Sequence, residues 1–140
     1  MDETIDPVAT PTPVGNRLLI LEHDASFAAQ VAKVAQGVGV EASVAGNLRE
    51  FERQYVELQP GMLTLDVVLG KEDVFAVIEF LGQRRATEPI FLVSGYDHRL
   101  VDAVASAAMD FGLLVADRIP KSGDCLRRLT RQLKAYRLEV

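Results

Sequence analysis

The chain has 140 residues, of which 49% are hydrophobic and 25% charged, and its formal net charge is −5. This length and composition are typical of one folded domain and argue against extensive disorder. The acidic balance disfavours nucleic-acid binding. The single cysteine, Cys125, excludes an intramolecular disulfide and a multi-cysteine zinc site. No apolar run approaches the roughly 20 residues of a membrane span, and the acidic N-terminus differs from a basic signal peptide. We therefore expect a soluble, cytoplasmic protein with neither nucleic-acid nor membrane partners.

Residues 1–15 differ from the rest of the chain. They contain three acidic residues and three prolines, Pro7, Pro11 and Pro13, and they show no apolar period. This composition predicts a disordered or extended tail, followed by one domain over residues 16–140.

After the tail, short apolar runs alternate with segments of helical periodicity. The expected strands are residues 17–21, 40–44, 62–65, 90–93 and 113–116. The expected helices are residues 26–36, 47–58 with Asn47 as its cap, 73–84, 97–109 with Asp97 as its cap, and a last helix from Gly123 or Asp124 to Tyr136. Five strands alternating with five helices predict an α/β fold with a parallel sheet covered on both faces. Right-handed crossovers favour a doubly wound sheet of strand order 2-1-3-4-5.

Polar residues stand at the carboxyl ends of four expected strands, which are the ends where ligands bind in such a sheet. They are Glu22, His23 and Asp24 after the first strand, Asp66 after the third, Ser94 after the fourth and Lys121 after the fifth. In the doubly wound order these four strands lie side by side. Carboxylates with a divalent cation, a hydroxyl and an ammonium together suit phosphoryl transfer onto a carboxylate.

Taken in order, four segments of the chain resemble the receiver domains of bacterial two-component response regulators, which have a flavodoxin-like (βα)5 fold. The segments are residues 17–24, 60–70, 89–97 and 120–121, and the resemblance covers about residues 16–137. It implies that Asp66 is the phosphoacceptor, Ser94 the switch hydroxyl and Lys121 the phosphate partner. It also implies that Glu22, Asp24 and Asp66 hold Mg²⁺, that a histidine kinase or phosphotransfer protein is the donor, that a further protein receives the signal, and that the chain is not an enzyme.

Two residues depart from the family pattern. His23 stands where the family usually has an aspartate that ligates Mg²⁺, and imidazole is a poorer ligand for that hard cation. His23 as a ligand predicts weaker Mg²⁺ binding or a shift towards softer divalent ions; alternatively, His23 turns outward and water takes its place. Arg118 stands where receivers often have an aromatic residue, whose side chain rotates together with the switch hydroxyl. It is expected to form a salt link or to be a solvated surface arginine.

The end of the chain is unusually basic. Residues 118–137 hold seven basic residues and one acidic residue, whereas the rest of the chain holds eight basic and nineteen acidic residues. This asymmetry predicts a docking face for an acidic partner or for a second copy of the chain, because the resembled family often dimerises through its fourth and fifth helices. The alternative is a solvated helix face.

Two functions are compatible with these residues. The leading one is a phosphoacceptor receiver, and the alternative is a degenerate receiver that acts as a phosphorylation-independent interaction module, which His23 and Arg118 favour. Other enzymes and carriers of similar fold fit poorly. A flavodoxin needs a phosphate loop where the chain has Glu22, a haloacid-dehalogenase-type phosphatase needs an aspartate where it has Val68, and a P-loop needs a glycine-rich turn before Lys121.

Overall fold

The computed structural model describes residues 16–95 and 98–137. The expected tail over residues 1–15 and the expected cap Asp97 therefore lie outside the described residues.

One sheet of five parallel strands, in the order β2-β1-β3-β4-β5, runs through the domain and confirms the expected doubly wound topology. The strands are β1 Arg17–Leu21, β2 Glu41–Ala45, β3 Met62–Asp66, β4 Ile90–Ser94 and β5 Val115–Pro120. Strands β1, β3 and β4 each have a neighbour on both sides, and their side chains are almost all buried. Continuous apolar runs are typical of strands in this position.

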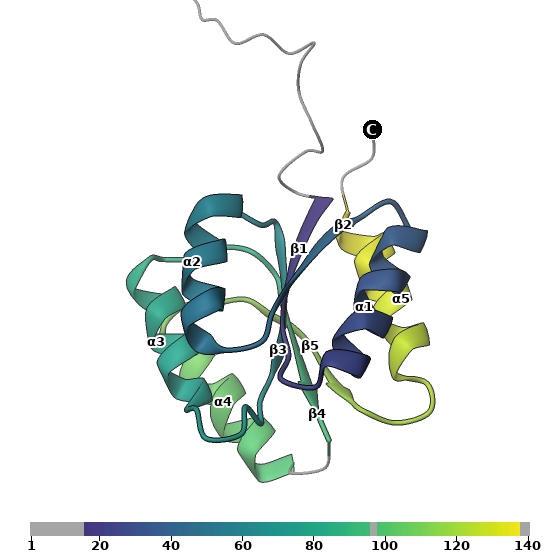
Figure 1. The fold of residues 1–140 in the computed structure, drawn as a ribbon. Helices are drawn as coiled ribbons and strands as arrows, with labels where there is room; N and C mark the ends of the chain where they lie inside the picture. The colour runs from purple at the N-terminus through teal and green to yellow at the C-terminus, as the bar shows by residue number, and fades with distance from the viewer. Residues whose placement is uncertain (1–15, 96–97, 138–140) are drawn as a thin grey trace, which may run out of the picture.

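The five helices confirm the expected alternation. They are α1 Ala25–Gly37, α2 Leu48–Leu58, α3 Val74–Gln83, α4 His98–Asp110 and α5 Cys125–Tyr136. Helices α1 and α5 cover one face of the sheet, and α2, α3 and α4 cover the other (Figure 1). Successive side chains of a strand point to opposite faces, so Leu18 and Ile20 of β1 join the core under α1 and α5, whereas Leu19 and Leu21 join the other core. No helix in the described part of the chain is long and apolar enough to cross a membrane.

Strand β5 differs most from expectation. It was expected over residues 113–116 and instead spans Val115–Pro120, with Asp117 and Arg118 inside it. Two features explain this difference. β5 lies at the edge of the sheet and needs no continuous apolar run, and its pairing with β4 shifts register, since Val115 lies opposite Ile90 but Asp117 lies opposite Phe91.

Candidate functional site

Four strand ends bring the expected site residues to one edge of the sheet. Glu22 directly follows β1, Asp66 ends β3, Ser94 ends β4 and Lys121 directly follows β5. Asp66 lies opposite Val93 in the β3–β4 pairing. The Lys121 backbone N–H donates to the Ser94 carbonyl at 2.7 Å, which places the lysine beside β4. The sheet topology thus assembles residues that are up to 99 positions apart in the sequence.

Asp66 is the centre of this cluster and is only 2% exposed. Its Oδ1 accepts a hydrogen bond from the Val68 backbone N–H at 3.0 Å, which fixes the orientation of the carboxylate. Its Oδ2 lies 3.0 Å from His23 Nδ1 and 3.4 Å from Lys121 Nζ. The second oxygen is therefore the one that faces the His23 ring and the Lys121 ammonium.

Glu22 and Lys121 form a second contact across the site. Lys121 Nζ donates to Glu22 Oε2 at 3.0 Å, and Glu22 is 3% exposed. Burial, followed by the interaction with the nearby Asp66 carboxylate, raises the pKa of Glu22 to about 7 against the opposing effect of Lys121. Burial by itself lowers the pKa of Lys121, but the hydrogen bond to Glu22 and the charge on Asp66 outweigh it and hold that pKa above its usual value.

Lys121 also lies over an aromatic ring that sequence analysis did not identify. Its Nζ is 4.6 Å from the centroid of the Phe27 ring, a cation–π contact contributed by α1. Phe27 lies within the helix expected over residues 26–36 and is found in α1. No sequence signal indicates that its ring supports the lysine, since the two residues meet only in the folded sheet.

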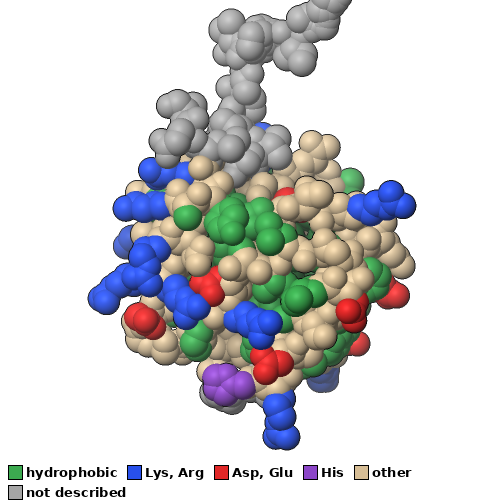
Figure 2. Space-filling view, turned by 180° about the vertical axis from the view of Figure 1, so that it is seen from behind, with side chains coloured by type: hydrophobic (Ala, Val, Ile, Leu, Met, Phe, Trp, Pro, Cys, Tyr) green, Lys and Arg blue, Asp and Glu red, His purple; other side chains and the backbone are tan. Residues whose placement is uncertain are grey.

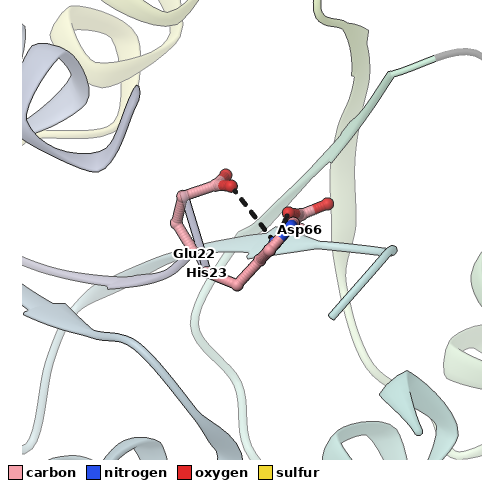
Figure 3. Close-up of side chains that lie close together, drawn as sticks. All are labelled: Glu22, His23 and Asp66. Atoms are coloured by element: carbon pink, nitrogen blue, oxygen red, sulfur yellow. Dashed lines mark hydrogen bonds and ion pairs between the residues drawn. The ribbon is translucent and has the colours of Figure 1, made fainter. Parts of the chain in front are cut away.

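His23 points into the site and not away from it (Figure 3). Its Nδ1 lies 3.0 Å from Asp66 Oδ2 and 3.7 Å from Glu22 Oε2, while 45% of the side chain remains exposed. Of the two orientations considered from the sequence, the structure has the inward one. The imidazole therefore lies at the solvent-facing side of two buried carboxylates.

Asp24, expected in the acidic pocket, caps helix α1. Its Oδ1 accepts hydrogen bonds from the backbone N–H groups of Ser26 at 3.0 Å and Phe27 at 3.2 Å. The side chains that could hold a metal ion together in the described part of the chain are Glu22, His23 and Asp66, whose donor atoms all lie within 4.8 Å of one another. Asp24 stands outside that group, and its role as a metal ligand stays a prediction.

The cap leads to a prediction about stability. Asp24→Ala removes both hydrogen bonds and is expected to lower the free energy of unfolding by about 1 kcal/mol. Asp24→Asn keeps a cap acceptor and is expected to stay within about 0.5 kcal/mol of the wild type. Urea denaturation of both variants measures this difference. Equal losses in the two variants would mean that the negative charge of Asp24, and not its cap, carries its contribution.

Ser94 supplies a buried hydroxyl at the end of β4. The residue is 6% exposed, and its Oγ has no hydrogen-bond partner among the described residues. Buried polar atoms without a partner are uncommon and are often found where a protein binds a ligand. The hydroxyl is therefore able to donate to a group that enters the site.

Arg118 forms the salt link considered from the sequence. Its Nη1 lies 2.7 Å from Asp102 Oδ1 of α4, and the two side chains are 46% and 68% exposed. A cavity of about 240 Å³ lies beside this pair, and its apolar lining includes Leu92, Val101 and Ile119. Because the pair is open to solvent, it contributes at most about 1 kcal/mol to stability.

No family model matches the chain, and no curated protein matches it. Solved structures of the same fold do match. A response regulator receiver domain from Bermanella marisrubri has a TM-score of 0.67 and 24% identity, and the match covers 84% of this chain and 97% of that one. The beryllofluoride-activated NtrC4 receiver domain dimer has a TM-score of 0.66 and 21% identity, with 86% and 97% covered.

A third neighbour is solved with a ligand. The response regulator TrrA from Thermotoga maritima, in complex with Mg²⁺ and BeF, has a TM-score of 0.66 and 19% identity, and the match covers 84% of this chain and 97% of that one. These likenesses extend over most of each chain. They show that this chain has the flavodoxin-like fold of response-regulator receiver domains.

Proposed function

We propose that this chain, which has the fold of response-regulator receiver domains, accepts a phosphoryl group on Asp66 and relays a signal to a partner protein. The observation that carries the proposal is the buried Asp66 carboxylate, whose Oδ2 lies 3.4 Å from the Lys121 ammonium at the edge where four strands end. In the transfer, an Asp66 oxygen forms a bond to phosphorus while the bond from phosphorus to the donor's histidine nitrogen breaks. A histidine kinase or a phosphotransfer protein supplies that donor.

Two further groups fit this chemistry. Lys121 neutralises part of the negative charge that a phosphoryl group adds beside two carboxylates. Ser94 Oγ lacks a partner among the described residues and is able to donate to a phosphoryl oxygen. Ser94 lines a cavity together with His98 and Val101 of α4, so a new contact of its hydroxyl with a phosphoryl group is expected to alter the surface of α4 that a partner contacts.

A divalent cation belongs to the proposed chemistry, and Glu22, His23 and Asp66 are the residues that would hold it. When bound, it masks negative charge as the phosphoryl group approaches the carboxylates. The two carboxylate oxygens fit Mg²⁺, the ion named for TrrA, but the imidazole nitrogen does not. We therefore expect His23 to weaken Mg²⁺ binding relative to an aspartate at this position.

Acetyl phosphate with Mg²⁺ tests the proposal. The wild type is expected to gain the mass of one phosphoryl group in intact-mass spectrometry, and Asp66→Asn is expected to gain none, because the amide lacks the nucleophilic carboxylate oxygen. Asp73→Asn is the matched control, since Asp73 is an exposed residue that caps α3. No adduct on the wild type with either Mg²⁺ or a softer divalent ion, or an equal adduct on Asp66→Asn, would disprove Asp66 as the acceptor.

The second candidate function is a receiver that binds its partner without phosphorylation. Two observations favour it: His23 stands beside Asp66, and Arg118 pairs with Asp102 at the surface. This function predicts the same partner affinity for the wild type and for Asp66→Asn. The phosphoacceptor function predicts that acetyl phosphate changes the affinity of the wild type alone.

Partner binding is proposed through α4 and α5, either to a second copy or to an acidic protein. Two basic residues of this region are already paired with acidic side chains of the same chain, because Arg128 pairs with Asp117 at 2.6 Å and Arg118 pairs with Asp102. The exposed basic residues of α5 are Arg127, Arg131 and Lys134. Figure 2 shows Lys and Arg side chains gathered on the side of the molecule where α5 lies. Sedimentation of the protein with and without acetyl phosphate tests whether a second copy is the partner.

A further inference from the structure

The donor atoms of the Glu22–His23–Asp66 cluster lie within 4.8 Å of one another, and the His23–Asp66 pair already has the spacing of two ligands on one cation. A cation with metal–donor distances near 2.1 Å holds adjacent donors about 3.0–3.4 Å apart, depending on its geometry. His23 Nδ1 lies 3.0 Å from Asp66 Oδ2 and 3.7 Å from Glu22 Oε2. Two of the ligands are thus in place, and the Glu22 carboxylate has to move closer to the His23 ring for all three side chains to share one ion.

The charges of the cluster also favour a cation. Glu22 is 3% exposed and Asp66 is 2% exposed, and the one ammonium that contacts both carboxylates is Lys121 among the described residues. Two buried carboxylates with one ammonium leave a negative charge that is costly to bury. The His23 ring, which is 45% exposed, lies between this charge and solvent, so an ion can enter beside it.

The donor types decide which ion fits. Mg²⁺ prefers oxygen donors in a near-octahedral shell and keeps most of its waters. Imidazole suits zinc, copper, iron and nickel, and the affinity of such ligands for divalent ions rises from manganese to copper before falling at zinc. Imidazole nitrogen and carboxylate oxygen are both zinc donors, and zinc sites with three protein ligands keep a position for water or substrate.

We propose that the Glu22–His23–Asp66 cluster binds a divalent transition-metal ion of the zinc class in preference to Mg²⁺, with the His23 imidazole as a direct ligand. This proposal deepens the proposed function, because it names the cation of the same site. It stands on the arrangement of the donors and does not require that Asp66 be phosphorylated. Lys121 shares oxygens with the cluster, so it has to move away as the ion binds.

Histidine ring signals in nuclear magnetic resonance give a direct test. The full chain has two histidines, so a ¹⁵N-labelled sample shows two imidazoles, and His98→Gln assigns them. Zn²⁺ is expected to shift the His23 ring nitrogens and to saturate that shift. Mg²⁺ at about 100 times that concentration is expected to leave them in place. Movement of the His98 ring alone, or equal responses to Zn²⁺ and Mg²⁺, would overturn the proposal.

Substitution of His23 gives the matched comparison. In calorimetric titrations His23→Asp is expected to bind Zn²⁺ at least about tenfold more weakly than the wild type, and to bind Mg²⁺ more tightly. His23→Asn removes the imidazole without adding charge, and is expected to lose Zn²⁺ affinity without gaining Mg²⁺ affinity. Circular dichroism confirms that each variant is folded. Unchanged Zn²⁺ affinity in folded His23→Asn would show that the imidazole is not a ligand.

The test separates this proposal from the phosphoacceptor function. A phosphoryl adduct formed with Mg²⁺, together with His23 signals that ignore Zn²⁺, would overturn the metal proposal and leave the function standing. Zn²⁺ binding through His23, with no adduct formed in the presence of either Mg²⁺ or Zn²⁺, would support the metal proposal and count against Asp66 as an acceptor.

Discussion

Lys121→Met is expected to lower the free energy of unfolding by about 3 kcal/mol at pH 8, which lies above the pKa of about 7 of Glu22. Lys121 Nζ contacts Glu22 Oε2 at 3.0 Å and Asp66 Oδ2 at 3.4 Å, and the lysine side chain is 20% exposed. Without the ammonium, two buried carboxylates face each other with no lysine between them. Methionine keeps the length and the apolar part of the side chain, so the loss reports the charge. Urea denaturation followed by circular dichroism measures it.

Two comparisons isolate the cause. Lys134→Met changes an exposed lysine of α5 and is expected to shift stability by less than about 0.5 kcal/mol. Glu22→Gln combined with Lys121→Met removes one of the two carboxylates and is expected to recover most of the loss. A double variant as unstable as Lys121→Met alone would mean that the lysine acts through packing against Phe27 and not through charge.

The interior of the sheet follows directly from the sequence. Strands β1, β3 and β4 were expected at residues 17–21, 62–65 and 90–93, and each is found within one residue of those bounds. Their side chains are buried on both faces of the sheet, which is why each strand is a nearly continuous apolar run in the sequence. The edge strand β5 lacks that constraint, and its polar residues Asp117 and Arg118 gave no strand signal.

The place of the site was also predictable, whereas its contacts were not. Topology alone put Asp66, Ser94 and Lys121 at one edge, because parallel strands end together. The inward orientation of His23 depends on Asp66, 43 residues away in the sequence. The pairing of Arg118 depends similarly on Asp102 of α4. These side-chain orientations depend on residues that are close in space but distant in sequence, so the periodicity of strands and helices does not predict them.

Glu22→Gln is expected to be more stable than the wild type at pH 8, and this advantage is expected to be much smaller at pH 5. The reason is that the pKa of Glu22 is raised from 4.5 to about 7 in the folded protein. Between these two values the folded protein binds a proton more tightly than the unfolded chain. The stability that this proton supplies is complete below pH 4.5 and is lost as the pH rises through about 7. A shift of this size corresponds to up to about 3 kcal/mol, and glutamine does not titrate.

The quantity to compare is therefore the difference in free energy of unfolding between the wild type and Glu22→Gln at each pH. Urea denaturation at pH 5, 6, 7 and 8 is expected to show wild-type stability falling relative to Glu22→Gln, with most of the fall complete by pH 8. Glu79→Gln, which changes an exposed carboxylate of α3, is expected to run parallel to the wild type throughout. Parallel curves for Glu22→Gln would show that the Lys121 contact fully compensates the burial of Glu22. A wild type that instead gains stability relative to Glu22→Gln towards pH 8 would mean that the ion pair with Lys121 outweighs the effects of burial and of the nearby Asp66.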